Sequence, residues 1–258
     1  MKMSRVQSLV STLTVQAAFA CSLLIGGASL AMAAAPFKDT MAQHTLACTA
    51  CHGPQGRAAA DGYYPRLAGK PAGYLYNQLL NFREERRHYG LMTQLIDPLS
   101  NAYLLEIAQY FSNLDLPYPV PSASQAPAAV LALGQQLVMQ GDASRKLAAC
   151  VQCHGRAMTG VAPNIPGLLG LLRDYINAQL GAWKAGQRRA HPPDCMHFVI
   201  TRLSLSDINA VASWIAAQPL PANARPAAAM PAWPPSLDAM LGGSAPMPPG
   251  LSGLEAQK

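Results

Sequence analysis

The chain has 258 residues, of which 50% are hydrophobic and 12% are charged, and its formal net charge is +6. This length suits two small domains or one large one. Apart from Arg83, Arg86 and Arg87, no compact group of basic residues is present, and none is interleaved with aromatic residues. The composition therefore argues against a nucleic-acid-binding protein.

Residues 1–35 have the composition of an export segment. Lys2 and Arg5 give it a positively charged start, an apolar stretch follows, and residues 31–33 (AMA) match an A-x-A cleavage site. The charge-free run over 6–37 is also long enough to span a bilayer. We therefore predict a signal peptide, with an uncleaved membrane anchor as the alternative.

Residues 38–115 are predicted to form a first helical domain. A short helix is expected over 40–50, and a longer one over 72–85, where apolar residues recur at helical spacing. Ser100 is placed as the N-cap of the last helix of this domain. The inner face of that helix is predicted to carry Leu104, Ile107, Ala108 and Phe111.

Two segments share one pattern, C-x-x-C-H, at residues 48–52 (CTACH) and 150–154 (CVQCH). This is the attachment signature of c-type haem: the two thiols form thioether bonds to the porphyrin, and the histidine supplies the proximal iron ligand. One copy alone could be a redox C-x-x-C or half of a zinc site. Two copies behind a secretory start favour two covalently bound haem c groups. The predicted attachment residues are Cys48, Cys51, Cys150 and Cys153, and the predicted proximal ligands are His52 and His154.

The rest of the chain repeats the first domain. Residues 116–127 are rich in proline and predict a semi-rigid linker. Residues 128–218 then show helices over 128–140 and 174–186, and Ser204 is placed as the N-cap of the final helix. No strand pattern is found in either half. Corresponding residues lie about 101 positions apart, which indicates a duplicated domain. The Pro/Ala-rich tail, residues 219–258, is predicted to be disordered or wrapped over the surface.

The sixth iron ligand is predicted from the repeat. Met92 and Met196 both fall in the loop before the last helix of their half, each seven residues ahead of a Leu-Ser pair. A thioether at that place would complete the coordination of a low-spin haem. The competing ligands are His88, His191, His197 and Cys195.

Basic residues end the second helix of each half, and two interpretations of them remain open. They could pair with haem propionates, because arginine matches carboxylate geometry, or they could be solvated at a helix end. These residues are Arg83, Arg86 and Arg87 in the first half and Lys184, Arg188 and Arg189 in the second.

Residues 38–218 resemble the dihaem cytochrome c4 family. The resemblance rests on the duplicated C-x-x-C-H-G segments, the loop at 64–69 (YPRLAG), the helix after it, and a Met loop before a Leu-Ser-capped helix. It implies an all-α fold of two cytochrome c domains about a pseudo-twofold axis. It also implies His/Met ligation of both haems, and periplasmic electron transfer to a terminal oxidase or another redox partner. Two departures are Glu85, where the family has Gly, and the thiol of Cys195.

The sequence thus predicts an exported, periplasmic dihaem cytochrome that carries single electrons between redox enzymes of a respiratory chain and has no catalytic residues. Its partners would be a donor and an acceptor protein, such as a dehydrogenase and a terminal oxidase. The alternatives are a haem oxidoreductase with a Cys-ligated or open second haem, and the membrane-tethered cytochrome subunit of a larger complex.

Overall fold

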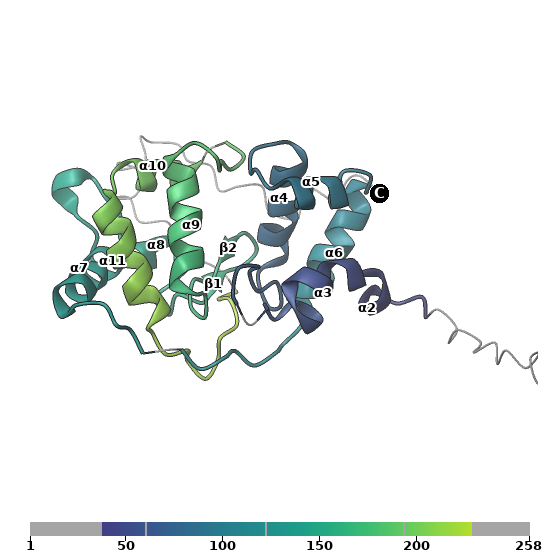
Figure 1. The fold of residues 1–258 in the computed structure, drawn as a ribbon, viewed down its shortest axis with the longest axis horizontal. Helices are drawn as coiled ribbons and strands as arrows, with labels where there is room; N and C mark the ends of the chain where they lie inside the picture. Colours follow the sequence, from purple (N-terminus) through teal and green to yellow (C-terminus); the bar gives the residue numbers. More distant parts are fainter. Residues whose placement is uncertain (1–37, 60, 122, 193, 229–258) are drawn as a thin grey trace, which may run out of the picture. The chain divides into compact units, whose positions relative to one another are not determined.

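The computed structural model describes residues 38–59, 61–121, 123–192 and 194–228 (Figure 1). From Asp39 onward these residues belong to one compact unit. The first half contains α2 (Met41–His44), α3 (Leu46–His52), the 3-10 turn η1 (Pro54–Gly56), α4 (Ala72–Arg83), α5 (Gly90–Ile96) and α6 (Asn101–Asn113). The second half contains α7 (Ala128–Met139), the 3-10 turn η2 (Ala143–Arg145), α8 (Cys150–His154), β1 (Gly160–Val161), β2 (Ile165–Pro166), α9 (Arg173–Lys184), α10 (Cys195–Thr201) and α11 (Leu205–Ala216).

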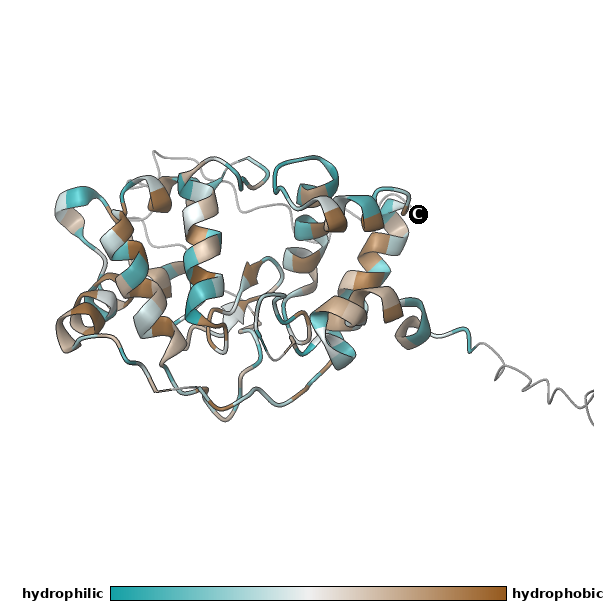
Figure 2. Ribbon diagram, in the orientation of Figure 1, coloured by the Kyte–Doolittle hydropathy of each residue, from teal (hydrophilic) through white to brown (hydrophobic). Residues whose placement is uncertain are grey.

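The halves repeat the same helix order: α3, α4, α5 and α6 of the first half correspond to α8, α9, α10 and α11 of the second. Each half has its own apolar core. The first centres on Leu104 and Phe111 of α6, which are 0% and 1% exposed. The second centres on Val211 and Ile215 of α11, which are also buried. These helices carry apolar and polar residues along their length, as Figure 2 shows, so each buries one face and leaves another in water. The predicted all-α class is confirmed.

The predicted caps are present at both final helices. The Ser100 hydroxyl accepts a hydrogen bond from the Tyr103 backbone N–H at 3.2 Å. The Ser204 hydroxyl accepts one from the Asp207 N–H at 3.0 Å, and the Asp207 carboxylate accepts one from the Ser204 N–H at 2.8 Å. This reciprocal pair is a capping box, which fixes where α11 begins.

Three local expectations were wrong. The helix expected over 40–50 is divided into α2 and α3 at Thr45, whose buried hydroxyl donates to the Met41 carbonyl at 2.7 Å. The expected loops around the methionines contain the short helices α5 and α10, which pack against the apolar cores of their halves. The second half also contains a two-stranded antiparallel pair, β1 and β2, each too short to show a periodic pattern in the sequence.

The linker and the start of the tail lie against both halves. Arg66 in the first half donates to the carbonyl of Pro117 at 3.1 Å, at the beginning of the linker. After α11, Arg225 forms an ion pair with Asp115 at 2.7 Å. Ala227 then pairs with the backbone beside β1. The described part of the predicted tail, up to residue 228, thus runs over the protein surface, and the remainder lies outside the described residues.

Candidate functional site

A cavity of about 950 Å³ is lined by residues from both halves of the chain. That volume is at the upper end of the usual range for ligand pockets, about 300–1,000 Å³. The cavity brings together most of the predicted site residues: Cys48, His52, Met92, Cys150, Cys153, His154 and Met196. Cys51 instead lines a small adjoining pocket with His52 and Met92.

His52 and His154 are the last residues of α3 and α8, and both are buried. Nδ1 of His52 lies 2.8 Å from the carbonyl oxygen of Pro65, and Nδ1 of His154 lies 2.8 Å from that of Pro166. Since a carbonyl only accepts, each Nδ1 carries the proton and donates it. The lone pair of a neutral imidazole is then on Nε2, which is the arrangement a metal-ligating histidine needs.

The pKa of each histidine favours the same neutral form. Burial lowers the pKa of His52, and the charge of Arg87 lowers it further, while the bond to Pro65 opposes the shift. Burial likewise lowers the pKa of His154, and here the additional charge is that of Lys70. Because a protonated imidazole has no free lone pair, both environments keep a nitrogen available for coordination.

The residue after each histidine allows the chain to turn. Gly53 has φ 74° and Gly155 has φ 82°, both in the left-handed region. At Gly53 a Cβ would also lie 2.3 Å from the carbonyl oxygen of Ala58. A larger residue there would displace the segment that follows the histidine, so the C-x-x-C-H-G pattern has a steric reason.

The four motif cysteines lie three residues apart on α3 and on α8, so each pair shares one helix face. All four are free thiols in the described residues, with no disulfide between them. Burial raises the pKa of Cys48, and it raises those of Cys150 and Cys153 to about 12 and about 11. Each pair is therefore placed to form two thioether bonds to one porphyrin, and among the described residues no group of three or more His, Cys, Asp or Glu side chains could hold a metal ion.

Met92 is the third residue of α5, and Met196 is the second residue of α10. Each is partly buried and packs against the core of its own half while lining the cavity. The repeat position predicted from sequence thus corresponds to an equivalent place in the fold, on equivalent helices.

The competing ligands differ from one another in placement. His88, His191 and His197 are exposed, although the first two also reach the cavity wall. Cys195 is the first residue of α10 and lines the cavity. Burial, and then the charge of Asp194, raises the pKa of its thiol. The surroundings of Cys195 therefore favour its protonated form.

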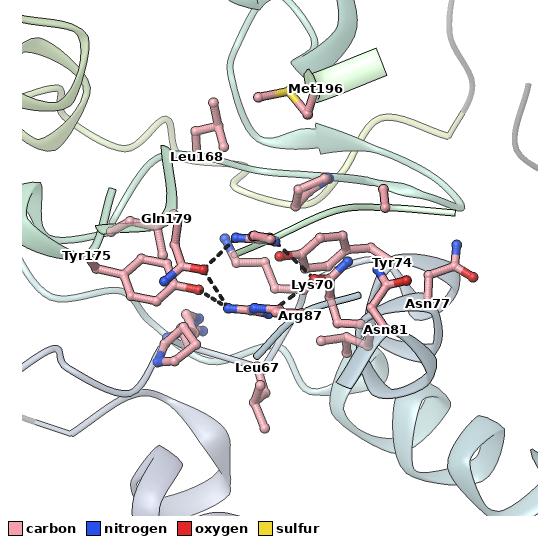
Figure 3. A pocket seen from close by; sticks show the side chains of 18 of the residues that line it. Leu67, Lys70, Tyr74, Asn77, Asn81, Arg87, Leu168, Tyr175, Gln179 and Met196 are labelled. Carbon is pink, nitrogen blue, oxygen red and sulfur yellow. Dashed lines mark hydrogen bonds between the residues drawn. The ribbon is translucent and has the colours of Figure 1, made fainter. Parts of the chain in front are cut away.

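Two arginines face one another between the halves. The backbones of Arg87 and Arg188 form an antiparallel bridge. The side-chain amide oxygen of Gln179 accepts from Arg87 at 2.7 Å and from Arg188 at 2.6 Å. Gln78 accepts from the same two arginines at 3.1 and 3.0 Å. Figure 3 shows Arg87 with its bonds to Gln179 and Tyr175.

The contacts of the two arginines follow the internal repeat. Arg87 lies over the ring of Phe82 at 4.5 Å, and Arg188 lies over that of Trp183 at 3.8 Å. Arg188 is only 4% exposed, so a solvated helix end is the wrong interpretation for it. Burial, together with the charge of Arg87, lowers the pKa of Arg188 to about 10. No ion pair among the described residues involves either arginine.

Three other basic residues of these helix ends bond to groups within their own half. Arg83 donates to the Leu99 carbonyl at 3.1 Å, and Lys184 donates to the Leu203 carbonyl at 2.5 Å. Both contacts hold the turn just before the last helix of their half. Arg86 pairs with the partly exposed Glu84 at 2.6 Å.

Sequence reasoning missed Lys70. This residue follows the loop at 64–69, is 4% exposed, and donates from Nζ to the carbonyl oxygen of Gly167 at 2.7 Å. Its bond joins the two halves beside the cavity. The sequence contained one signal for it. Lys70 is basic, whereas the residue at the equivalent repeat position, Leu171, is apolar, so the two halves differ in charge at this point.

Known proteins place these features in context. A family model described as cytochrome c matches residues 38–102. A thiosulfate dehydrogenase electron acceptor from Thiomonas intermedia is 40% identical over 176 residues, covering 67% of this chain and 79% of that protein. Cytochrome c4 from Pseudomonas aeruginosa is 31% identical over 195 residues, covering 75% of this chain and 94% of that protein.

Two solved structures are similar as well. Reduced cytochrome c4 from Pseudomonas stutzeri superposes with a TM-score of 0.58 at 30% identity, covering 70% of this chain and 98% of that one. Thiosulfate dehydrogenase (TsdBA) from Marichromatium purpuratum gives a TM-score of 0.58 at 32% identity, covering 67% of this chain. The match extends over only 36% of that longer protein.

The helical fold and the paired attachment motifs define a c-type cytochrome. More particularly, the chain belongs to the dihaem cytochrome c4 family. The predicted resemblance, and the fold of two tandem cytochrome c domains, are confirmed. The protein therefore carries two covalently bound haem c groups and transfers electrons between redox partners, as a carrier and not as an enzyme.

Within the residues that the structure describes, no helix is both long and apolar enough to cross a membrane. The predicted export segment or anchor, residues 1–35, lies outside them.

Proposed function

We propose that each haem is held by the cysteine pair and histidine of its own motif and by the methionine of its own half. The observation that carries this assignment is the matched pair of hydrogen bonds from His52 to Pro65 and from His154 to Pro166, both 2.8 Å. Each bond leaves Nε2 free for iron. In this assignment Cys48, Cys51, Cys150 and Cys153 form the thioethers, His52 and His154 are the proximal ligands, and Met92 and Met196 are the distal ones.

The cavity has charges that suit two haem groups. Arg87 and Arg188 present cations at the cavity wall without a carboxylate partner among the described residues. A buried cation is costly unless it is paired. Haem propionates are carboxylates, and arginine binds carboxylates strongly. The two arginines would therefore direct the propionates of both groups toward the boundary between the halves.

The haem supplies a one-electron couple at its iron, and the residues of this chain adjust it. A histidine and a methionine would occupy both axial positions, which leaves no place for a substrate. The apolar cores around Leu104 and Val211 limit the access of water. Two such centres in one chain would pass electrons one at a time across the boundary between the halves.

We also propose the division of the chain into a first cytochrome domain at 38–115, a linker at 116–127 and a second domain at 128–218. The separate apolar cores of the two halves support it. The leader at 1–35 would direct the chain to the periplasm, because bacteria attach c-type haem outside the cytoplasmic membrane.

The proposed electron donor is a thiosulfate dehydrogenase. Two similar proteins, from Thiomonas intermedia and Stutzerimonas stutzeri, are named as electron acceptors of that enzyme and are 40% and 34% identical to this chain. Cytochromes c4 are close to 30% identical. The acceptor would be a terminal oxidase or another redox protein.

The donor is tested by mixing the oxidised holoprotein with a thiosulfate dehydrogenase and thiosulfate, and following haem reduction by absorbance. We expect both haems to be reduced, and no reduction when either the enzyme or thiosulfate is omitted. Protein whose two haems are reduced by dithionite, but not by the complete enzyme mixture, would exclude this donor.

A further inference from the structure

Lys70 links the first half of the chain to the second haem motif. It lies between the loop at 64–69 and α4, and its side chain is almost completely buried. Its ammonium donates to the carbonyl oxygen of Gly167, 97 residues later, at 2.7 Å. Figure 3 shows Lys70 within the pocket, among residues of both halves.

The bond of Lys70 falls next to the proximal side of the second site. Gly167 follows Pro166, whose carbonyl accepts the Nδ1–H bond of His154. A shift of Gly167 would therefore move the acceptor that orients His154. The ammonium of Lys70 and the imidazole of His154 thus bond to the carbonyl groups of two adjacent residues, Gly167 and Pro166.

The contribution of Lys70 is not repeated in the other half. Arg87 and Arg188 occupy equivalent positions and share their acceptors, so each half supplies one arginine to the boundary. The position equivalent to Lys70 is Leu171, which carries no charge. The two haem sites thus differ by one buried lysine, and this lysine comes from the opposite half. Burial, and then the charge of Arg66, lowers the pKa of Lys70 to about 7, and a carboxylate in the cavity would favour its charged form.

Among the residues that the structure describes, Lys70 has no carboxylate partner. Its nitrogen lies 6.0 Å from the centroid of the Tyr118 ring, and the guanidinium carbon of Arg66 lies 3.8 Å from the same centroid. None of the ion pairs among the described residues includes Lys70. An ammonium has three donors, so donors besides the one used by Gly167 are available to a carboxylate in the cavity.

We propose that Lys70 is a cross-domain positioning residue of the second haem, which holds the segment that orients His154 and raises the reduction potential of that haem relative to the first. The proposal rests on the assignment of His154 as proximal ligand. Reduction lowers the charge of the iron by one unit, so a nearby cation stabilises the reduced state. The effect is largest where burial limits screening by water.

The test uses the full-length holoprotein with Lys70→Met, which removes both charge and hydrogen bond, and Lys70→Gln, which keeps an amide donor. Arg156→Gln is the matched control, because Arg156 is an exposed cation two residues after His154. Redox titration gives the two midpoint potentials, and paramagnetic NMR assigns each to its haem through the haem methyl signals. Haem content and thermal unfolding are measured on the same samples.

We expect both Lys70 variants to shift the equilibrium between the two haems about tenfold away from the second, equivalent to about 59 mV for one electron. The first haem and the Arg156→Gln protein should change far less. Equal shifts at both haems, no shift, or an equal effect of Arg156→Gln would overturn the proposal. A preparation that lacks the second haem would instead contradict the proposed attachment site, so haem content separates the two failures.

Discussion

Glu85 has a left-handed backbone conformation, with φ 57°, two residues after the end of α4. Its counterpart after α9 is Gly186, with φ 73°, and a Cβ at Gly186 would meet no atom within 4 Å. The same turn is therefore made by glycine in one half and by glutamate in the other. Only glycine adopts this conformation without a steric cost.

Exchanging these residues should change stability in opposite directions. Glu85→Gly is expected to raise the free energy of unfolding by about 1 kcal/mol, because strain is removed at an exposed position. Gly186→Glu should lower it by a similar amount. Thermal or urea unfolding of the holoprotein measures both. A loss of stability in Glu85→Gly would show that the glutamate side chain contributes more than the strain costs.

At the scale of single elements, the start of α11 depends on charge. Asp207 is 6% exposed, caps α11 with Ser204, and accepts from Arg145 at 2.7 Å. Burial raises its pKa, but the hydrogen bonds of Ser204 and Arg145 outweigh this and lower the pKa overall. The second partner of Arg145 is Asp142, whose pKa is lowered to about 2 by bonds from Ser144 and Arg145.

The lowered pKa values predict an acid-sensitive contact. A carboxyl group with a depressed folded-state pKa contributes stability above its unfolded pKa, about 3.9, and loses it as pH falls through the folded-state value. Asp207→Asn should therefore cost about 1–2 kcal/mol near pH 7, or roughly 2–8 °C in Tm for a chain of this size. The difference from the unsubstituted protein should shrink below about pH 4. A difference that stays constant down to pH 3 would contradict this account.

The sequence predicted most elements from simple local signals. Ser100 and Ser204 fixed the starts of the last helices, and the apolar spacing over 72–85 placed α4 within two residues. It could not predict the short helices that carry Met92 and Met196. Helices of seven residues depend on packing more than on their own propensity.

At the scale of the whole molecule, the contacts between the halves could not be read from one chain segment. Gln78 and Gln179 have no local signature, and their partners are up to 110 residues away in sequence. Only the repeat offset relates Gln78 to Gln179. It predicts that the two residues occupy equivalent positions, but it does not predict that they contact the same arginines. For the same reason Lys70 was missed, since its acceptor, the Gly167 carbonyl, is a backbone atom of the opposite half.

We expect Gln179 to contribute most to the cooperative unfolding of the two halves. Its amide oxygen is shared by Arg87 and Arg188, so Gln179→Met would leave two adjacent cations with one acceptor fewer. We expect a loss of about 1–3 kcal/mol and a separation of unfolding into two transitions in calorimetry. Gln136→Met, at an exposed position of α7, is the control. A single transition, unchanged in both variants, would mean that the network does not couple the halves.

The central assignment, a histidine and a methionine on each iron, is tested most directly by the oxidised absorption spectrum of the holoprotein. The weak methionine–iron band at the red end of the visible range should have the intensity of two such centres per chain. Met92→Ala and Met196→Ala should each remove half of it while both haems remain attached. A wild-type band of one centre or none would contradict the assignment, and Cys195 and the nearby histidines would then be the ligands to examine.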